Sequence, residues 1–207
     1  TQGVSSAAAD VYKRQDYRQQ IDLIKLLFHL PPPECVGDLW LERFSPYFMR
    51  PEEYGITIKA PGEAYPYVYD APEIDHFKIA YDFEFESSVQ IDPKLKQELY
   101  DIAAEWKRRH QSEQLPFLLF TKSMDFVKVY DDRSLKSTQV RLEGAAAKVF
   151  LHCNESPKTL DQFNEHLKKE NMQESAEDAI KFLEAKGLIY GERGKYLNLA
   201  LPHNPNL

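Results

Sequence analysis

The stretch "LIYGERGKYLNLAL" (Leu188–Leu201) decides the fold of the C-terminal part of the chain. Apolar residues on both sides of a Gly-Glu-Arg-Gly turn predict two strands joined as a hairpin. Gly187 stands directly before the first strand, in the position where a glycine commonly ends a helix. The sequence therefore predicts a helix that is followed at once by a two-stranded hairpin.

Three helices are predicted upstream of this hairpin. Apolar residues recur at helical spacing in Glu143–Cys153, Thr159–Lys169 and Ser175–Lys186. Ser156-Pro157 separates the first two, and Ser175 is the expected N-cap of the third, with Asp178 three residues later. Three helices followed by a two-stranded wing are the layout of a winged helix.

The charge of this region disfavours DNA binding, the first function that a winged helix suggests. Acidic residues outnumber basic ones between Glu143 and Leu201, and the chain as a whole has a formal net charge of −7. Contacts to phosphate dominate DNA binding and need cations on the helix that enters the groove. The third helix and its approach instead carry Glu174, Glu177, Asp178 and Glu184. A peptide- or protein-binding winged helix, or a structural domain, remains open.

The N-terminal half begins with a helix and a strand. "YRQQIDLIKLLFHL" (Tyr17–Leu30) has an apolar helical face and stops at the prolines Pro31–Pro33. "VGDLWLERF" (Val36–Phe44) alternates in side-chain character and predicts a strand. A helix, a tight break, a strand and an irregular loop form an α/β pattern, in which sites gather at the C-terminal ends of parallel strands.

The middle of the chain gives a mixed prediction. Ala64–Asp70 reads as a short strand or an aromatic lid, and Ile74–Phe85 fits neither period, although we favour helix for its first half. Asp92–His110 is predicted to be a helix with Asp92 as N-cap ahead of Pro93. Phe117–Thr121 and Phe126–Asp131 are predicted to form a hairpin.

The segment "SSAAADVYKRQ" (Ser5–Gln15) resembles a string that arises when adapter sequence is translated at the ends of metagenomic reading frames. It lacks the basic and apolar regions of a signal peptide. We therefore expect residues 1–15 to be non-native and disordered. Because the chain starts with Thr1, we also expect the natural protein to extend further in the N-terminal direction.

The sequence contains no motif for a metal or nucleotide site. Its two cysteines, Cys35 and Cys153, are too few for a cysteine-only zinc or iron–sulfur site. Its six histidines include no pair at metal-ligand spacing on one helix. A G-x-S-x-G, a P-loop and a dinucleotide fingerprint are absent, and no apolar run approaches the roughly 18 residues of a membrane span. Thiols of this kind are typical of a reducing cytosol, so we expect a cytoplasmic protein.

Four segments together suggest a family. They are "HLPPP" (His29–Pro33), "LERFSPYFMRPEEYG" (Leu41–Gly55), "AYPYVYD" (Ala64–Asp70) and "LEGAAAKVFLHC" (Leu142–Cys153). In this order they resemble the C-terminal half of radical SAM enzymes that mature ribosomally made peptides. The group is the cobalamin-binding-domain type, often called RiPP maturation radical SAM protein 1 and regarded as peptide C-methyltransferases. The most specific part is "RFSPYF", whereas Asp70 stands where the family usually has proline.

The resemblance implies that the chemistry lies upstream of this chain. In the family a cobalamin domain precedes a partial α/β barrel, whose three-cysteine loop binds a 4Fe–4S cluster and S-adenosylmethionine. Cys35 and Cys153 cannot supply such a loop, so we expect the fragment alone to bind no cofactor and to show no turnover. On this basis we expect an α+β fold. Residues 16–60 would end the radical SAM barrel, 61–137 would form a linker α+β subdomain, and 138–207 a winged-helix domain.

The resemblance also suggests candidate residues for a substrate or cofactor pocket. The segment Leu41–Gly55 would lie at the C-terminal end of a strand, where barrel enzymes place their sites. We hypothesise that Arg43 and Tyr47 face the pocket and that Arg43 offers its planar fork to a carboxylate. The residues expected to line or cover the pocket are Ser45, Tyr54 and Tyr67, with Tyr65 and Tyr69. The alternative is a compact packed loop in which Arg43 forms a salt bridge to Glu52 or Glu53.

The expected function follows from the same resemblance. We expect the C-terminal fragment of a cobalamin-dependent radical SAM methyltransferase that modifies a ribosomally synthesised precursor peptide, such as that of a bacteriocin. Its partner would be that peptide, and not nucleic acid or a membrane. The alternative is a non-catalytic winged-helix module that binds a peptide or protein, or regulates one.

Overall fold

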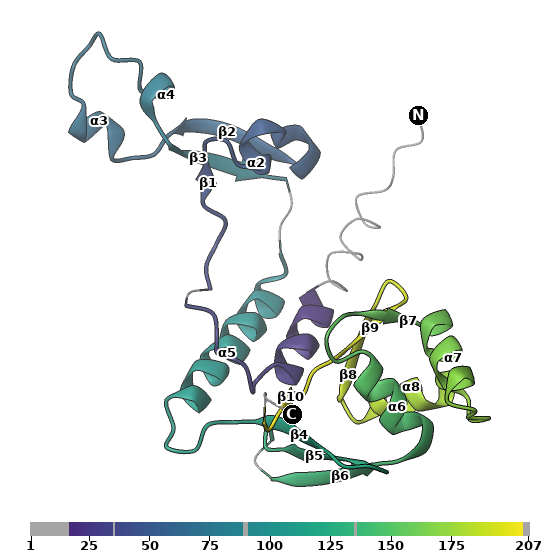
Figure 1. Cartoon of the computed structure of the whole chain (residues 1–207). Coiled ribbons are helices and arrows are strands. Elements are labelled where there is room, and N and C mark those ends of the chain that lie inside the picture. The colour runs from purple at the N-terminus through teal and green to yellow at the C-terminus, as the bar shows by residue number, and fades with distance from the viewer. Residues whose placement is uncertain (1–16, 35, 89–90, 135, 205–207) are drawn as a thin grey trace. The chain divides into compact units, whose positions relative to one another are not determined.

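The computed structural model describes residues 17–34, 36–88, 91–134 and 136–204. Contacts divide the chain into unit 1, whose described part is mainly Glu34–Tyr100, and unit 2, which comprises Gln19–Pro33 and Asp101–Leu207. Helices and largely antiparallel sheets alternate irregularly along the chain, so the fold is α+β (Figure 1). The expectations for residues 1–15 and for Cys35 lie outside the described residues.

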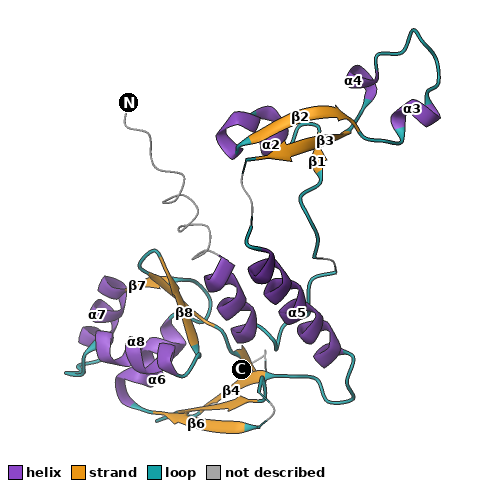
Figure 2. Ribbon diagram, turned by 180° about the vertical axis from the view of Figure 1, so that it is seen from behind, coloured by secondary structure: helices purple, strands orange, loops and turns teal. Residues whose placement is uncertain are grey.

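Unit 1 is built on a three-stranded antiparallel sheet of order β1-β3-β2. Its strands are β1 (Leu41–Glu42), β2 (Ile56–Pro61) and β3 (Asp82–Ser87). The connection from β1 to β2 contains α2 (Pro46–Met49) and the 3₁₀ helix η1 (Pro51–Tyr54). The connection from β2 to β3 contains α3 (Tyr65–Val68) and α4 (His76–Ile79), which Figure 2 shows as a long excursion beyond the sheet.

Several predictions for unit 1 are wrong in detail. The strand predicted over Val36–Phe44 is paired only at Leu41–Glu42, and it runs antiparallel to β3. Ala64–Asp70 forms the helical turn α3, because Tyr65 begins a turn that the Tyr69 amide closes by donating to the Tyr65 carbonyl. Ile74–Phe85 contains a helix in its first half, as favoured, and β3 in its second. The assignment of residues 16–60 to the end of a barrel stays a prediction.

Unit 2 contains a second sheet, of order β10-β4-β5-β6. The predicted hairpin is confirmed as β4 (Leu118–Lys122) and β5 (Val127–Asp131). The sequence did not indicate β6 (Thr138–Leu142), which pairs antiparallel with β5. It also assigned Leu201 to the wing, whereas β10 (Leu201–Pro202) leaves the wing and pairs in parallel with β4.

The winged-helix layout is present in unit 2. Its helices are α6 (Gly144–His152), α7 (Leu160–Lys169) and α8 (Ala176–Ala185), close to the predicted bounds. The short strand β7 (Lys158–Thr159) joins the wing strands β8 (Ile189–Glu192) and β9 (Lys195–Asn198) in the order β7-β9-β8. Ser175 caps α8 by accepting a hydrogen bond from the Asp178 amide at 3.3 Å, as predicted. Gly187 ends the helix with φ of 62°, a conformation that favours glycine.

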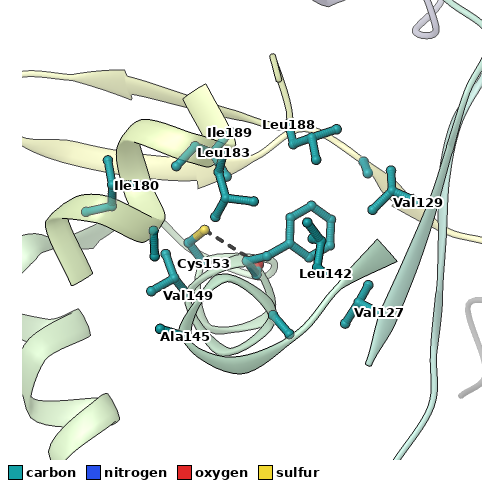
Figure 3. Packing of buried hydrophobic residues seen from close by; sticks show 14 of the residues in the cluster. Val127, Val129, Leu142, Ala145, Val149, Cys153, Ile180, Leu183, Leu188 and Ile189 are labelled. Carbon is teal, nitrogen blue, oxygen red and sulfur yellow. Dashed lines mark hydrogen bonds between the residues drawn. The ribbon is translucent and has the colours of Figure 1, made fainter. Parts of the chain in front are cut away.

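One hydrophobic core unites the β10-β4-β5-β6 sheet with the winged helix. Val127, Val129 and Leu142 of the sheet pack with Val149 of α6 and Leu183 of α8, all fully or almost fully buried (Figure 3). The expected boundary between residues 137 and 138 therefore crosses a continuous core. The expected boundary between residues 60 and 61 falls within β2, which pairs with β3 across it. The residue ranges of the two units therefore differ from the expected domain ranges, because strand pairing and burial join residues that are distant in the chain.

The N-terminal helix, residues 17–26, leads into a turn that packs in unit 2. The long helix α5 (Pro93–His110) holds this turn through its C-terminal half, because Trp106 donates to the Leu30 carbonyl and His110 to the Phe28 carbonyl, each at 2.8 Å. His29 is buried and donates through Nε2 to the Leu199 carbonyl at 2.8 Å. Burial lowers the pKa of His29, so the neutral imidazole is the stable form.

Cys153 is expected to be protected from alkylation while unit 2 is folded. Its side chain is fully buried and lies 3.6 Å from the Phe150 carbonyl (Figure 3), and burial raises the pKa of its thiol to about 12. Because the thiolate is the reactive form, iodoacetamide should modify Cys153 only after denaturant is added. Peptide mapping by mass spectrometry checks this, with Cys35 followed separately as the second thiol. Equal modification of Cys153 in native and denatured protein would contradict the burial.

Candidate functional site

Arg43, the leading candidate from the sequence, is engaged inside unit 1. Its Nε donates to the Ala80 carbonyl at 2.5 Å, and its Nη2 donates to the Phe77 carbonyl. The guanidinium also lies over the rings of Phe48 and Phe83, 5.3 and 4.9 Å from their centroids. The fork that was expected to meet a carboxylate therefore joins β1 to the turn between α4 and β3.

Ser45 and the predicted salt bridge also have local structural explanations. Ser45 is the N-cap of α2, and its hydroxyl accepts a hydrogen bond from the Phe48 amide at 3.2 Å. Glu53 pairs with Arg50 at 3.0 Å rather than with Arg43. The packed-loop alternative thus describes the surroundings of Arg43 and Ser45 correctly but names the wrong ion pair.

The candidate tyrosines are brought together only in part. Tyr47 and Tyr54 meet edge to face, with ring centroids 4.6 Å apart. Tyr65 faces inward, because its hydroxyl accepts a hydrogen bond from the Tyr81 amide at 2.7 Å. Tyr67 is 86% exposed on α3 and has no aromatic partner among the described residues. The structure therefore gathers two tyrosine pairs, Tyr47 with Tyr54 and Tyr65 stacked on Tyr69 with ring centroids 6.1 Å apart, and leaves Tyr67 in solvent.

Unit 1 has a small buried core and many exposed apolar side chains. The buried core consists of Leu41, Ile56, Ala80 and Phe83. We call the exposed side chains the aromatic surface of unit 1; it comprises Leu39, Trp40, Phe44, Tyr47, Met49, Tyr54, Tyr67, Val68, Tyr69, Phe77, Ile79 and Tyr81. Exposed apolar side chains mark a contact surface where they form a contiguous patch.

Unit 2 contains a cavity that the sequence did not indicate. It has a volume of about 730 Å³ and lies between the end of β4, the C-terminal end of α6, β7 and the chain after β10. We call it the basic cavity; its lining residues are Phe120, Thr121, Lys122, Leu151, His152, Asn154, Glu155, Ser156, Lys158, Pro202, His203 and Asn204. Because these residues come from three separate stretches of the chain, no local motif could have revealed the cavity.

The charged groups of the basic cavity are mainly cationic. Lys122 and Lys158 line the cavity together with a single carboxylate, that of Glu155, and with two histidines, His152 and His203. Lys158 is half-buried, and its Nζ contacts the Ser156 hydroxyl at 2.8 Å. Among the ion pairs of the described residues, none includes Lys122 or Lys158. The cavity therefore has a surplus of positive charge within an acidic chain.

The pKa of His152 depends on burial and on the positive charges near this cavity. Its ring stacks on that of His166 of α7, with centroids 4.2 Å apart and planes at 4°. Burial lowers the pKa of His152 first, and the positive charges of His166, Lys158 and Lys169 lower it further. A second cavity of about 570 Å³ shares Lys122, Leu151 and His152 with the first and continues along α6 to the β4–β5 turn. The two cavities adjoin at these shared residues, and the second also contains Asp125, Lys148 and Glu170.

Neither unit offers a metal centre among its described residues. No group of three or more histidine, cysteine, aspartate or glutamate side chains in the described ranges could hold a metal ion. Cys153 is buried and carries a thiol whose pKa is about 12, so it is unsuited to ligate iron as a thiolate. No helix in the described part of the chain is long and apolar enough to cross a membrane.

Comparison with protein-family models, with curated proteins and with solved structures finds no match to this chain.

Proposed function

We propose that this chain is the C-terminal part of a cobalamin-dependent radical SAM enzyme that C-methylates a ribosomally synthesised precursor peptide. The 4Fe–4S cluster, S-adenosylmethionine and cobalamin would be held by upstream domains. The donor set here does not fit a cluster, because Cys153 is buried and protonated and the described residues form no metal-binding group. This chain would contribute contacts to the substrate and no bond-making step. The enzyme would work in the reducing cytoplasm, where thiols stay free.

The observation that carries this proposal is the aromatic surface of unit 1. It includes Phe44, Tyr47 and Met49, which belong to the segment that resembles the family most specifically. These side chains are not part of the buried core of unit 1 and remain exposed. We propose that the upstream barrel covers them, so that unit 1 closes the wall of the active site in the complete enzyme.

The decisive experiment is to recover the coding sequence upstream of Asp16 and to express the complete protein anaerobically. A three-cysteine loop within the preceding ~200 residues, about one domain's length, supports the enzyme. Iron and cobalamin should then copurify with the complete protein, and S-adenosylmethionine should be cleaved. The present chain, purified in parallel as the control, should do neither. A start codon close to Asp16 would end this proposal.

Arg43→Ala in the complete enzyme separates a pocket role from a structural one. Loss of two charged hydrogen bonds and of stacking on Phe48 and Phe83 should destabilise unit 1 by about 2–3 kcal/mol. A pocket role predicts that turnover, measured below the melting temperature, falls further than this destabilisation explains. Equal losses of turnover and stability would leave Arg43 as a structural residue only. Arg50→Ala, which removes an exposed arginine of the same loop, is the matched control.

A second candidate function is supported by the basic cavity. A non-catalytic winged-helix module that binds a peptide or protein would need only unit 2, which has a continuous core of its own. DNA remains disfavoured, because Glu177 and Asp178 lie in the first turn of α8. Peptide binding without any upstream enzyme domain in the gene would favour this module.

A further inference from the structure

We infer that the basic cavity of unit 2 binds the carboxylates of an acidic, extended peptide segment. This inference deepens the proposed function by giving the peptide partner a charge and a docking place, and it rests on that function in taking the ligand to be a peptide. It does not require the radical chemistry, because all of its residues lie in unit 2.

The first argument is charge. The chain has a formal net charge of −7, yet Lys122 and Lys158 line one concave site that holds the single carboxylate of Glu155. Lysines of an acidic protein readily find carboxylates, as Lys148 does with Glu170 at 2.7 Å. A cleft lined by uncompensated charge of one sign focuses the electric field and attracts ligands of the opposite sign.

The second argument is shape. A volume of about 730 Å³ lies within the range of ligand sites, roughly 300–1,000 Å³. The shared residues Lys122, Leu151 and His152 extend the site into the second cavity, which reaches Met124 in the β4–β5 turn and Met172 after α7. Two adjoining cavities with both polar and apolar lining fit a chain segment better than a compact anion.

The third argument concerns the kind of anion. The basic cavity lies at the C-terminal end of α6, whose partial negative charge opposes any anion, and opposes a doubly charged phosphate more strongly than a singly charged carboxylate. Its lining contains no arginine that could bind phosphate with two hydrogen bonds. The neutral donors of Thr121, Asn154 and Ser156 stand beside the lysines and suit carboxylates spaced along a peptide.

Binding of an anion should be linked to protonation of His152. The charged and titratable groups that share a cavity with this imidazole or act on its pKa are Lys148 of its own helix, Lys122, Asp125, Glu155, Lys158 and His203, and His166, Lys169 and Glu170 of α7. A bound carboxylate would oppose the repulsion of the imidazolium by the lysines and raise the pKa of His152. By linkage, the peptide should bind more tightly as the pH falls through 6.5, the ordinary pKa of histidine, toward the lowered pKa of His152 in the free protein, while its glutamates, with an ordinary pKa of about 4.3, stay mostly ionised.

The test measures fluorescence anisotropy of a labelled glutamate-rich decapeptide on the purified chain. Lys122→Gln/Lys158→Gln should weaken binding about tenfold or more, because two charged hydrogen bonds are lost. Lys181→Gln, which removes an exposed lysine of α8 outside both cavities, should leave the affinity unchanged. An NMR titration should show the His152 pKa rising when the peptide is bound, and thermal melts should show that each variant is folded.

Three outcomes would overturn the inference. They are equal affinity for the glutamate peptide and its glutamine counterpart, unchanged affinity in the folded double variant, and displacement of the peptide by inorganic phosphate at similar concentration. Since the assay uses no cofactor, these results would leave the radical SAM proposal standing. Conversely, a missing cysteine loop upstream would end that proposal and leave the binding result intact.

Discussion

Replacing Phe150 with alanine is expected to lower the free energy of unfolding of unit 2 by about 3–5 kcal/mol. The Phe150 side chain is fully buried and meets the Phe120 ring of β4 edge to face at 5.3 Å. It therefore lies where the sheet and the winged helix share their core. Truncation removes the transfer free energy of the ring and leaves a cavity that rigid neighbours on two sides cannot fill.

Trp106 offers a local probe for this measurement. The chain has two tryptophans, and Trp106 is 7% exposed in unit 2, whereas Trp40 is 70% exposed in unit 1. Urea unfolding of Phe150→Ala in a Trp40→Phe background therefore follows unit 2. Phe182→Ala, which truncates a phenylalanine that is 43% exposed on α8, should cost much less. Similar losses for the two variants would mean that the sheet and the winged helix do not share one core.

Asp131→Ala is expected to destabilise unit 2 by about 3–5 kcal/mol, because it leaves the Arg133 guanidinium buried without its counter-ion. Arg133 is 7% exposed and donates to both carboxylate oxygens of Asp131, at 2.9 and 2.7 Å. Its Nη1 also donates to the Leu26 carbonyl at 2.8 Å, so the pair fixes the N-terminal helix. Asp131→Ala/Arg133→Met should recover much of the loss. If Arg133→Met worsened the single variant, an unpaired buried charge could not be the cause.

The same pair gives unit 2 a dependence on acid. Burial alone would raise the pKa of Asp131, but the hydrogen bonds and the charge of Arg133 outweigh it and hold the pKa below its ordinary value of 3.8. The stabilisation is therefore complete above pH 3.8 and is lost as the pH falls below it through the lowered pKa. Between pH 5 and pH 2, Asp131→Ala should lose less stability than the wild type. Parallel curves would show that another group causes the acid sensitivity.

The helices of the winged helix could be predicted because their signals are local. The bounds of α6, α7 and α8 follow from apolar spacing together with caps such as Ser175 and the glycine at position 187. The β4–β5 hairpin has the same local character. Strand β6 was missed because its exposed residues show little alternation, and its pairing depends on β5.

The candidate sites show a sharper division. We predicted Arg43 as a ligand-binding residue. The sequence around it does not reveal that Arg43 donates to the carbonyls of Phe77 and Ala80, more than 30 residues away. The basic cavity was missed, because Lys122, His152 and His203 lie on segments that only the parallel β4–β10 pairing and the packing of α6 bring together.

By itself, the sequence determined the three helices of the winged helix and the turn of the wing. Each is a property of neighbouring residues, since helical spacing, capping and turn chemistry act over one to four positions. Only the tertiary structure decided that the winged helix shares a core with a second sheet, that Arg43 is engaged by backbone carbonyls, and that cations surround a cavity in unit 2. These features depend on burial and strand pairing between residues far apart in the chain, and such pairing leaves no periodic mark on the sequence.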